Sequence, residues 1–170
     1  MKMKSTKEAF LELLNNYQGI LHKVSLVYFR NRHDREDNFQ EIVYQLWKSY
    51  PVLKNHQSVG SWIYAVAINT SIARVKKNFR IEYREKIPEL TDPSNFAEVI
   101  AQNESLQLLL NAIHRLDEVD KSIMLLYLEE KSYEEIAEII GITKSNAGVR
   151  INRAKERLKQ NLNNTSHGKQ

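Results

Sequence analysis

The sequence predicts an all-α fold with two small helical domains joined by a flexible linker, the C-terminal one a helix-turn-helix. Apolar residues recur at intervals of three and four along seven segments, which is the period of amphipathic helices. The chain has only 5 Gly and 3 Pro in 170 residues, too few for a turn-rich β fold. No strand-like alternation remains outside these segments, and two of the three prolines lie in 81–96, a stretch without a steady period.

The first half of the chain predicts three helices. Residues 10–28 carry the apolar stripe of one long amphipathic helix. Asp34, with Asp37 three residues later, resembles a capping box in which Asp replaces Glu, and it opens a second helix that Pro51 ends. A third helix spans about 60–80. Because its first half is apolar on every side, we expect that half to be buried centrally.

The second half predicts four more helices. A long helix carries apolar residues over 99–116, and a fifth helix surrounds 123–127. A capping box at 132–135 opens a short sixth helix. After a tight turn at 141–143, a seventh helix runs from Lys144 to about Leu162. We therefore expect a domain over 1–80, a linker over 81–97, a second domain over 98–165 and a frayed tail over 166–170.

Charge is divided unevenly along the chain. Residues 1–80 hold 13 Lys and Arg against 6 Asp and Glu, and residues 142–170 hold 7 against 1. Residues 101–141, in contrast, hold 3 against 9. Two basic regions separated by an acidic stretch predict two separate contacts with a polyanion.

Composition and missing motifs exclude several function classes. The absence of Cys excludes disulfides, thiolate metal sites and cysteine nucleophiles, and fits a reducing cytoplasm. No HExxH, P-loop or GxSxG motif is present and the five His lack metal-ligand spacing, so we expect neither an enzyme nor a cofactor. No secretory signal is visible, and the uncharged stretch 55–73 holds too many polar residues to insert into a membrane.

The short sixth helix, the Gly turn and the basic seventh helix have the arrangement of a helix-turn-helix. On a wheel of about 100° per residue, one narrow sector of the last helix is apolar and must pack on the preceding helices. That sector contains Ala147, Ile151, Ala154 and Leu158. Gly148 costs about 1 kcal/mol of helix propensity relative to Ala, which a close approach to a backbone would justify.

The opposite face of the last helix predicts DNA binding. Val149 is apolar on this polar, basic face, and it is either a stray exposed residue or a contact for a thymine methyl group in the major groove. The basic residues would serve phosphates or guanine edges. An ordinary solvated helix is the alternative, but the coincidence of capping box, Gly turn and basic asymmetry favours DNA. The candidates are Lys144, Ser145, Asn146, Val149, Arg150, Asn152, Arg153 and Arg157.

The third helix predicts a second nucleic-acid surface. Asn69, Ala73, Lys76 and Arg80 share one stripe, with Lys77 beside it and a polar loop before the helix. Such a surface would hold a single strand with a base extruded into a small pocket, although a solvated helix end is the simpler alternative. The candidates are Lys54, Asn55, His56, Gln57, Asn69, Lys76, Lys77 and Arg80.

The second helix has an acidic face instead. Asp34, Glu36, Asp37, Gln40 and Glu41 cluster beside its apolar stripe. In a basic domain such a face is more suited to a protein partner than to DNA. The alternative is that these residues only complement the helix dipole.

With these residues in view, the chain resembles bacterial RNA polymerase sigma factors of the sigma-70 superfamily, extracytoplasmic-function (ECF) class. The stretches DREDNFQEIVYQLW (34–47), SWIYAVAINTSIARVKK (61–77) and SYEEIAEIIGITKSNAGVRINRAKERL (132–158) carry the resemblance. They look like the family's segments for binding the core polymerase, for promoter melting with −10 recognition, and for reading the −35 element. The sequence departs from the family pattern at three places. The Leu-Pro common before the second helix of the second domain is Leu116-Asp117 here, and the Gly usual before Ser-Tyr-x-Glu is Lys131. Lys144 stands where an acidic residue is frequent.

The resemblance implies how the two domains would be used. The first would bind the β′ clamp helices and the −10 element, and the second the β flap and the −35 element. An anti-sigma factor would restrain activity. The clamp-binding set implied is Asp34, Asp37, Gln40, Glu41 and Trp47. Asn69 and the 54–58 loop would help select the −10 base, Lys76 and Lys77 would hold phosphates, and the last helix would read or brace the −35 element.

From the helix-turn-helix alone, a different class of protein stays open. A two-domain transcriptional repressor or activator would carry the same motif, bind an inverted repeat as a dimer, and need no polymerase. A protein-binding adaptor is a third possibility, which the two basic faces argue against.

Overall fold

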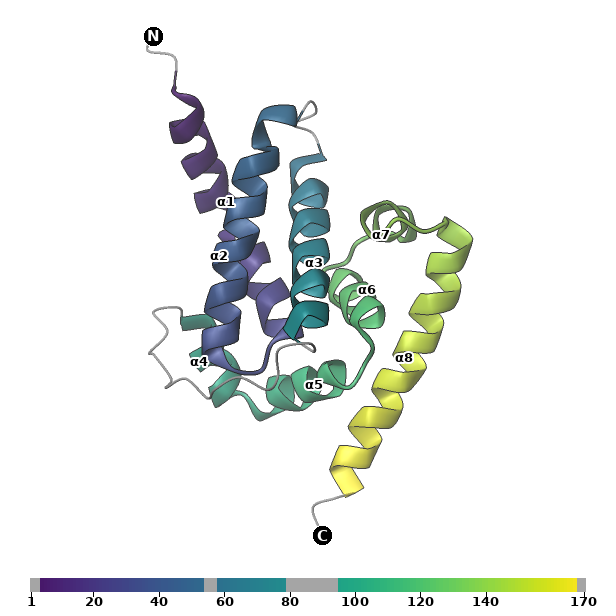
Figure 1. Cartoon of the computed structure of the whole chain (residues 1–170). Helices are drawn as coiled ribbons and strands as arrows, with labels where there is room; N and C mark the ends of the chain where they lie inside the picture. The colour runs from purple at the N-terminus through teal and green to yellow at the C-terminus, as the bar shows by residue number, and fades with distance from the viewer. Residues whose placement is uncertain (1–3, 54–57, 79–94, 168–170) are drawn as a thin grey trace.

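The computed structural model describes residues 4–53, 58–78 and 95–167. Within these ranges the chain forms eight α-helices and one short 3-10 helix, and it contains no strand (Figure 1). The all-α class predicted from the sequence is confirmed. None of the helices in these ranges is both long enough and apolar enough to cross a membrane.

The N-terminal bundle consists of α1 (Thr6–Tyr28), α2 (Arg32–Ser49) and α3 (Val59–Asn78), with the 3-10 helix η1 (Tyr50–Val52) after α2. The three helices pack against one another around fully buried Leu21, Ile42, Leu46 and Ile63. A polar contact joins them as well, because the buried Asn38 amide of α2 donates to Ser25 of α1 and to Ser71 of α3.

The start of α2 differs from the sequence prediction. The N-cap is Asn31, whose extended backbone lets its side-chain oxygen accept from the Asp34 amide at 2.8 Å. The capping box predicted at Asp34 and Asp37 is therefore wrong, because a competent cap lies one turn earlier. The Asp37 carboxylate instead contacts Arg74 of α3 at 3.1 Å.

The C-terminal half contains α4 (Asn95–Gln102), α5 (Glu104–His114), α6 (Glu118–Leu128), α7 (Tyr133–Ile140) and α8 (Lys144–His167). The single helix predicted over 99–116 is in fact two helices. Asn103 has an extended backbone between them, and its side chain accepts from the Leu106 amide at 3.1 Å. Asn, a good capping residue, begins a new helix here instead of continuing the old one.

The last helix is longer than predicted. It continues to His167, beyond the end expected near Leu162 and into the tail expected to fray over 166–170, of which 168–170 lie outside the described residues. Its final turns are tied to α5 by one side chain and supported by a bond within the helix. Asn161 donates to the Ala112 carbonyl of α5 at 3.1 Å, and the Thr165 hydroxyl donates to the Asn161 carbonyl at 2.8 Å.

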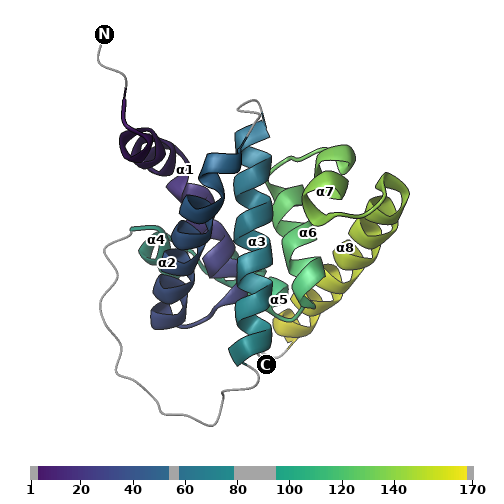
Figure 2. The same cartoon turned by 45° about the horizontal axis from the view of Figure 1, so that its top comes forward.

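The two halves of the chain pack directly on each other. In Figure 2, α3 lies between α2 and the pair α6 and α7, and α1 also contacts α5 and α6. The predicted central burial of the first half of α3 is confirmed for Ile63, Ala67 and Ile68, which are at most 2% exposed. The other side of this half is not fully covered, because Trp62 and Val66 are half-buried. Most of the linker predicted over 81–97 lies outside the described residues, but its last part, from Asn95, belongs to α4.

Polar contacts close the junction between the halves. The Tyr28 hydroxyl of α1 donates to the Glu118 carbonyl at 2.6 Å, and Lys23 pairs with Glu129 at 2.9 Å. His114 Nε2 donates to the Leu26 carbonyl at 2.9 Å. The buried apolar residues of both halves form one cluster, so in this structure the halves are held together by apolar burial and by these polar contacts.

Candidate nucleic-acid interface

The helix-turn-helix is fixed by local hydrogen bonds that the sequence encodes. Ser132 and Glu135 form both bonds of the predicted capping box. The Glu135 carboxylate accepts a hydrogen bond from the Ser132 backbone amide, which lowers the pKa of Glu135. Gly141 ends α7 with φ +82°, a left-handed conformation that glycine adopts without strain. Thr143 then accepts from the Asn146 amide at 3.1 Å and starts α8. The predicted capping box and turn are confirmed.

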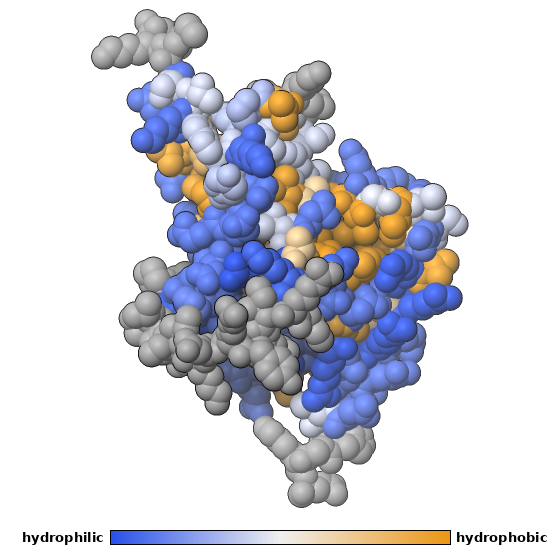
Figure 3. Space-filling model, viewed as in Figure 1, coloured by the Kyte–Doolittle hydropathy of each residue, from blue (hydrophilic) through white to orange (hydrophobic). Residues whose placement is uncertain are grey.

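The buried and exposed sides of α8 are the ones that the wheel predicts. Ala147, Ile151 and Ala154 are fully buried, and Leu158 is 8% exposed. On the opposite side Val149 is 48% exposed, and the neighbouring polar side chains are exposed as well. These are Ser145, Asn146, Asn152, Arg153 and Glu156. Figure 3 shows mostly hydrophilic side chains over α8, with an apolar one among them near its N-terminal part.

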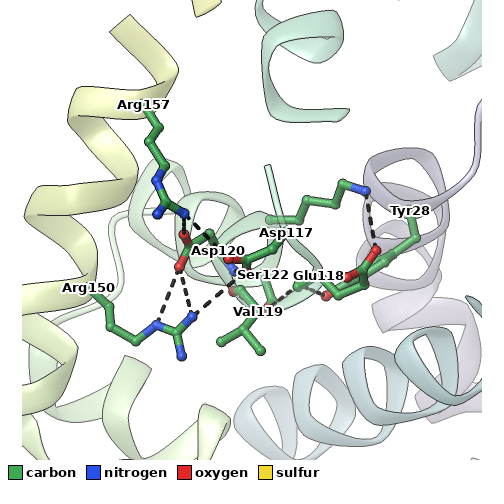
Figure 4. Close-up of polar contacts among 9 residues, drawn as sticks. Tyr28, Asp117, Glu118, Val119, Asp120, Ser122, Arg150 and Arg157 are labelled. Carbon is green, nitrogen blue, oxygen red and sulfur yellow. Dashed lines mark hydrogen bonds and ion pairs between the residues drawn. The ribbon is translucent and has the colours of Figure 1, made fainter. Parts of the chain in front are cut away.

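Three basic candidates on α8 have acidic partners within the protein. Lys144 pairs with Glu134 of α7. Arg150 bonds Asp120 through Nε at 3.3 Å and Nη2 at 3.2 Å, and Arg157 reaches the other oxygen of the same carboxylate at 3.1 Å (Figure 4). Arg150 is thus directed toward α6, whereas Arg153 is exposed to solvent.

The structure does not support the reason suggested for Gly148. A Cβ at this position would meet two atoms of the Tyr133 ring at 3.7 Å, an ordinary van der Waals contact with a side chain. Within the described residues, no backbone approaches closely enough to require glycine.

The third-helix candidates are only partly placed by the structure. Asn69, Lys76 and Lys77 are exposed on α3 and follow its predicted stripe. Lys54, Asn55, His56, Gln57 and Arg80 lie outside the described residues. Arg74 is not part of this exposed surface, because it is half-buried between Asp37 and the ring of Phe29, 6.0 Å from its guanidinium carbon.

The predicted acidic face lies along α2. Gln40 is exposed, and Asp34, Asp37 and Glu41 are half-buried. Glu41 accepts from Gln45 of the same helix at 2.9 Å, whereas Asp37 is tied to Arg74 of α3 and lies 3.4 Å from His33. Asp37 therefore also links α2 to α3, whereas the Glu41 bond stays within α2.

An apolar surface at the end of α2 extends beyond what the sequence predicted. Trp47 is 43% exposed although it packs edge-on against Phe10, with 5.0 Å between the ring centroids. Tyr44, three residues earlier on the same helical face, is also exposed. Trp47 was expected both in the apolar stripe and among the partner-binding residues, and its partial exposure is compatible with both roles.

Sequence reasoning missed the acidic contact on α8. Asp117 caps α6 by accepting from the Asp120 amide at 2.8 Å, and both carboxylates lie beside Arg150 and Arg157. Burial, followed by the nearby Asp117 charge, raises the pKa of Asp120, while the arginines oppose this shift. One signal was available in the sequence: the two arginines are seven residues apart, which places them on one side of a helix.

Comparisons with known proteins cover both halves of the chain. Residues 13–81 match the family model for sigma-70 region 2, and residues 106–158 match the model for sigma-70, region 4. RNA polymerase sigma factor YlaC of Bacillus subtilis is 27% identical over 86% of this chain and 87% of its own length. The ECF RNA polymerase sigma-E factor of Haemophilus influenzae is 27% identical over 92% of this chain and 88% of its own.

Solved structures match the fold over nearly the whole chain. The sigma factor RpoE from Bartonella quintana, solved in complex with the anti-sigma factor NepR, has a TM-score of 0.71 at 18% identity, covering 91% of this chain and 97% of its own. CnrH, solved in complex with the cytosolic domain of CnrY, has a TM-score of 0.62 at 17% identity, covering 94% and 90%. At identities of 17–18%, these two structures support the assignment of the fold.

The region 2 match disfavours the dimeric regulator left open by the helix-turn-helix, because it accounts for the front half of the chain. Two models from one superfamily match in order, and relatives named as ECF sigma factors align along nearly the whole length. The chain belongs to the sigma-70 superfamily of bacterial RNA polymerase sigma factors, in its extracytoplasmic-function class.

Proposed function

We propose that this chain binds core RNA polymerase and directs promoter-specific transcription initiation by recognising −10 and −35 elements. The polymerase would supply all catalysis, so the chain itself is not an enzyme and needs no cofactor. One observation carries the proposal: a single chain presents two basic helical surfaces, one on α3 within the region 2 match and one on α8 within the region 4 match. Joined on one polymerase, two modest DNA contacts act as one strong contact.

The −35 contact is assigned to the exposed face of α8. Ser145, Asn146 and Asn152 offer hydrogen bonds to base edges, and Val149 offers an apolar contact for a thymine methyl group. Arg153, exposed on the same helix, is the basic residue best placed for a phosphate or a guanine edge. Lys144 is assigned only a secondary phosphate contact, because its ammonium group already pairs with Glu134.

The −10 contact is assigned to α3 and the segment before it. Asn69 is the exposed amide that would hydrogen-bond an extruded base, and Lys76 and Lys77 would hold the adjoining phosphates of the single strand. Arg80 and the loop residues Lys54, Asn55, His56 and Gln57 are assigned to the same contact from the sequence alone.

The polymerase contact is assigned to α2. Its acidic residues Asp34, Asp37 and Glu41, with Gln40, would face the β′ clamp helices, and the exposed edge of Trp47 would add apolar area. The C-terminal bundle would contact the β flap. The proposed domain boundaries are 1–80 and 98–165.

An anti-sigma factor is the second protein partner that we propose. The two solved structures described above were captured with the anti-sigma factor NepR and with the cytosolic domain of CnrY. Figure 3 shows apolar side chains gathered on the surface over α3, α6 and α7. Leu128, at the end of α6, and Tyr133, at the start of α7, are exposed apolar side chains. Such a partner would restrain activity by covering the polymerase-binding faces. Function with the polymerase places the chain in the cytoplasm.

The test of the proposed function is run-off transcription with core polymerase on a library of random promoters. We expect the chain to select templates that share two short elements at a fixed spacing. Gel filtration with core polymerase should give stable co-elution. A free dimer that binds palindromic DNA without polymerase would contradict the proposal.

The α2 assignment is tested by Glu41→Lys. Glu41 is preferred to Asp37 because Glu41 accepts from Gln45 of its own helix, whereas Asp37 pairs with Arg74 of α3. We expect co-elution with core polymerase to be lost while the circular dichroism spectrum is unchanged. Glu98→Lys makes the same charge change on exposed α4 and should co-elute normally. Unchanged affinity of the Glu41 variant would remove α2 from the interface.

A further inference from the structure

The start of α6 carries a buried carboxylate that the proposed function does not use. Asp120 has a side chain that is only 4% exposed, and both of its oxygens contact arginines of α8. Arg150 donates to Asp120 Oδ1 from Nε and Nη2, and Arg157 donates to Asp120 Oδ2 from Nη1. Asp117 lies beside them, 3.8 Å from Arg150 and 3.5 Å from Arg157 (Figure 4).

This contact ties α8 to the start of α6 and adds to the buried stripe that already packs α8 on the preceding helices. Arg150 and Arg157 are separated by seven residues, or about two turns, so they lie on the same side of the helix. On the wheel they border the buried stripe that contains Ile151 and Ala154. A single carboxylate that holds both guanidinium groups resists a rotation of α8 that would move Val149 away from the outward direction.

The same contact withholds positive charge from DNA. Two carboxylates face two guanidinium groups, so the local charges balance. Arg150 is 31% exposed on its side chain and directs its guanidinium to Asp120, whereas Arg157 is 57% exposed and makes its contacts with the two carboxylates through Nη1. A guanidinium has five N–H donors, so Arg157 keeps others for a phosphate and is a shared contact.

We infer that Asp120, with Asp117 beside it, is a positioning residue that sets the specificity of the −35 contact by holding α8 in one orientation and by keeping Arg150 from phosphates. This inference rests on the proposed function, because it concerns the same −35 face. Phosphate contacts bind every sequence alike, whereas base contacts discriminate. Loss of the Asp120 charge therefore strengthens binding to any DNA and weakens the preference for the correct element.

The experiment uses the full chain with core polymerase and measures binding to two DNA duplexes at several salt concentrations. One duplex carries the −35 element selected in the run-off assay, and the other carries a scrambled −35 element with the same −10 element. In Asp120→Asn the side chain keeps its shape but loses its charge. We expect the ratio of the two affinities to fall by roughly 5-fold or more, the scale of one lost base contact.

The salt dependence separates this role from a purely structural one. Release of Arg150 adds a phosphate contact, so the slope of log K against log salt for the scrambled duplex should steepen by about 0.9. The charge-matched control Glu138→Gln, on the exposed side of α7, should change neither ratio nor slope. If Asp120→Asn weakens binding to both duplexes equally with an unchanged slope, the residue only stabilises the fold and the inference is overturned.

A second variant keeps the inference testable if Asp120→Asn does not fold. Arg150→Gln retains a donor for Asp120 but removes the cation. Because Arg150 is withheld from phosphates in the native chain, its loss should leave the slope on the scrambled duplex unchanged. A slope reduced by about 0.9 would show that Arg150 already binds phosphate, and would overturn the inference.

The native chain distinguishes failure of this inference from failure of the proposed function. If the native chain with core polymerase does not prefer the intact −35 duplex, the proposed function fails. If it does and the Asp120→Asn variant prefers it equally, only the positioning role fails.

Discussion

Replacing Gly148 by Ala should stabilise the chain. Gly148 lies within α8, where glycine costs about 0.8–1.0 kcal/mol relative to Ala. The new Cβ would lie 3.7 Å from the Tyr133 ring, an ordinary contact distance, so no steric cost offsets the gain. A gain of about 1 kcal/mol corresponds to a rise in melting temperature of roughly 2–4 °C for a chain of this size.

The assay is urea denaturation of the full chain followed by circular dichroism. With m-values of about 1–3 kcal/mol per molar urea, the midpoint should rise by roughly 0.3–1 M. Gly141→Ala is the matched comparison, because the same side chain is added where φ is +82°. That variant should lose about 1–2 kcal/mol, so the two substitutions have opposite signs.

The DNA readout tests the second half of the reasoning. Because the added methyl group faces Tyr133, binding to the −35 element should stay within about two-fold of the native value, well under the tenfold that 1.4 kcal/mol represents. A lower denaturation midpoint for Gly148→Ala would refute the packing argument. A stabilised variant that no longer uses −35 promoters would show that glycine is needed for approach to DNA.

Three further predictions follow from individual side chains. Glu130 has φ +59° and occupies the left-handed position after α6, so Glu130→Gly should raise the free energy of unfolding by about 1 kcal/mol in the same urea assay, and an unchanged or lower value would contradict this. Burial lowers the pKa of His114 below its usual value of 6.5, so the unfolded chain binds more protons at this residue and the free energy of unfolding should fall as pH drops below 6.5. His114→Gln keeps a donor for the Leu26 carbonyl and should lack this component of the pH dependence. A stability profile identical to that of the native chain would remove His114 as its source. Val149→Ala should weaken use of −35 promoters by about 1–3 kcal/mol in run-off transcription, whereas an equal loss on templates with a scrambled −35 element would argue against base reading.

The two halves of the chain are joined by a few polar contacts and by apolar packing. Lys23 with Glu129 and Tyr28 with the Glu118 carbonyl join α1 to α6. Partly buried ion pairs of this kind are modest in free energy, so the junction relies mainly on apolar contact. Separating the halves would therefore expose apolar surface to water.

Local features of the sequence determined the elements. The period of the apolar residues predicted the helices, although it merged α4 and α5 into one. Ser132 with Glu135 predicted the start of α7, because a capping box needs only residues three apart. The same locality explains the correct stripe of Ala147, Ile151, Ala154 and Leu158 on α8. The resemblance in motif order gave the family, and its residue roles remain predictions.

Only the tertiary structure decided which charged side chains are available to a partner. Arg150 and Arg153 are equivalent by composition, yet Arg150 bonds Asp120 and Arg153 is exposed. Asp37 and Glu41 likewise differ only because Arg74 of another helix reaches Asp37. Such pairings join residues 30 or more positions apart, and helical periodicity reports only on neighbours three or four positions apart. The packing of α6 against α8 brings Asp120 within reach of Arg150 but not of Arg153, and periodicity cannot predict this difference.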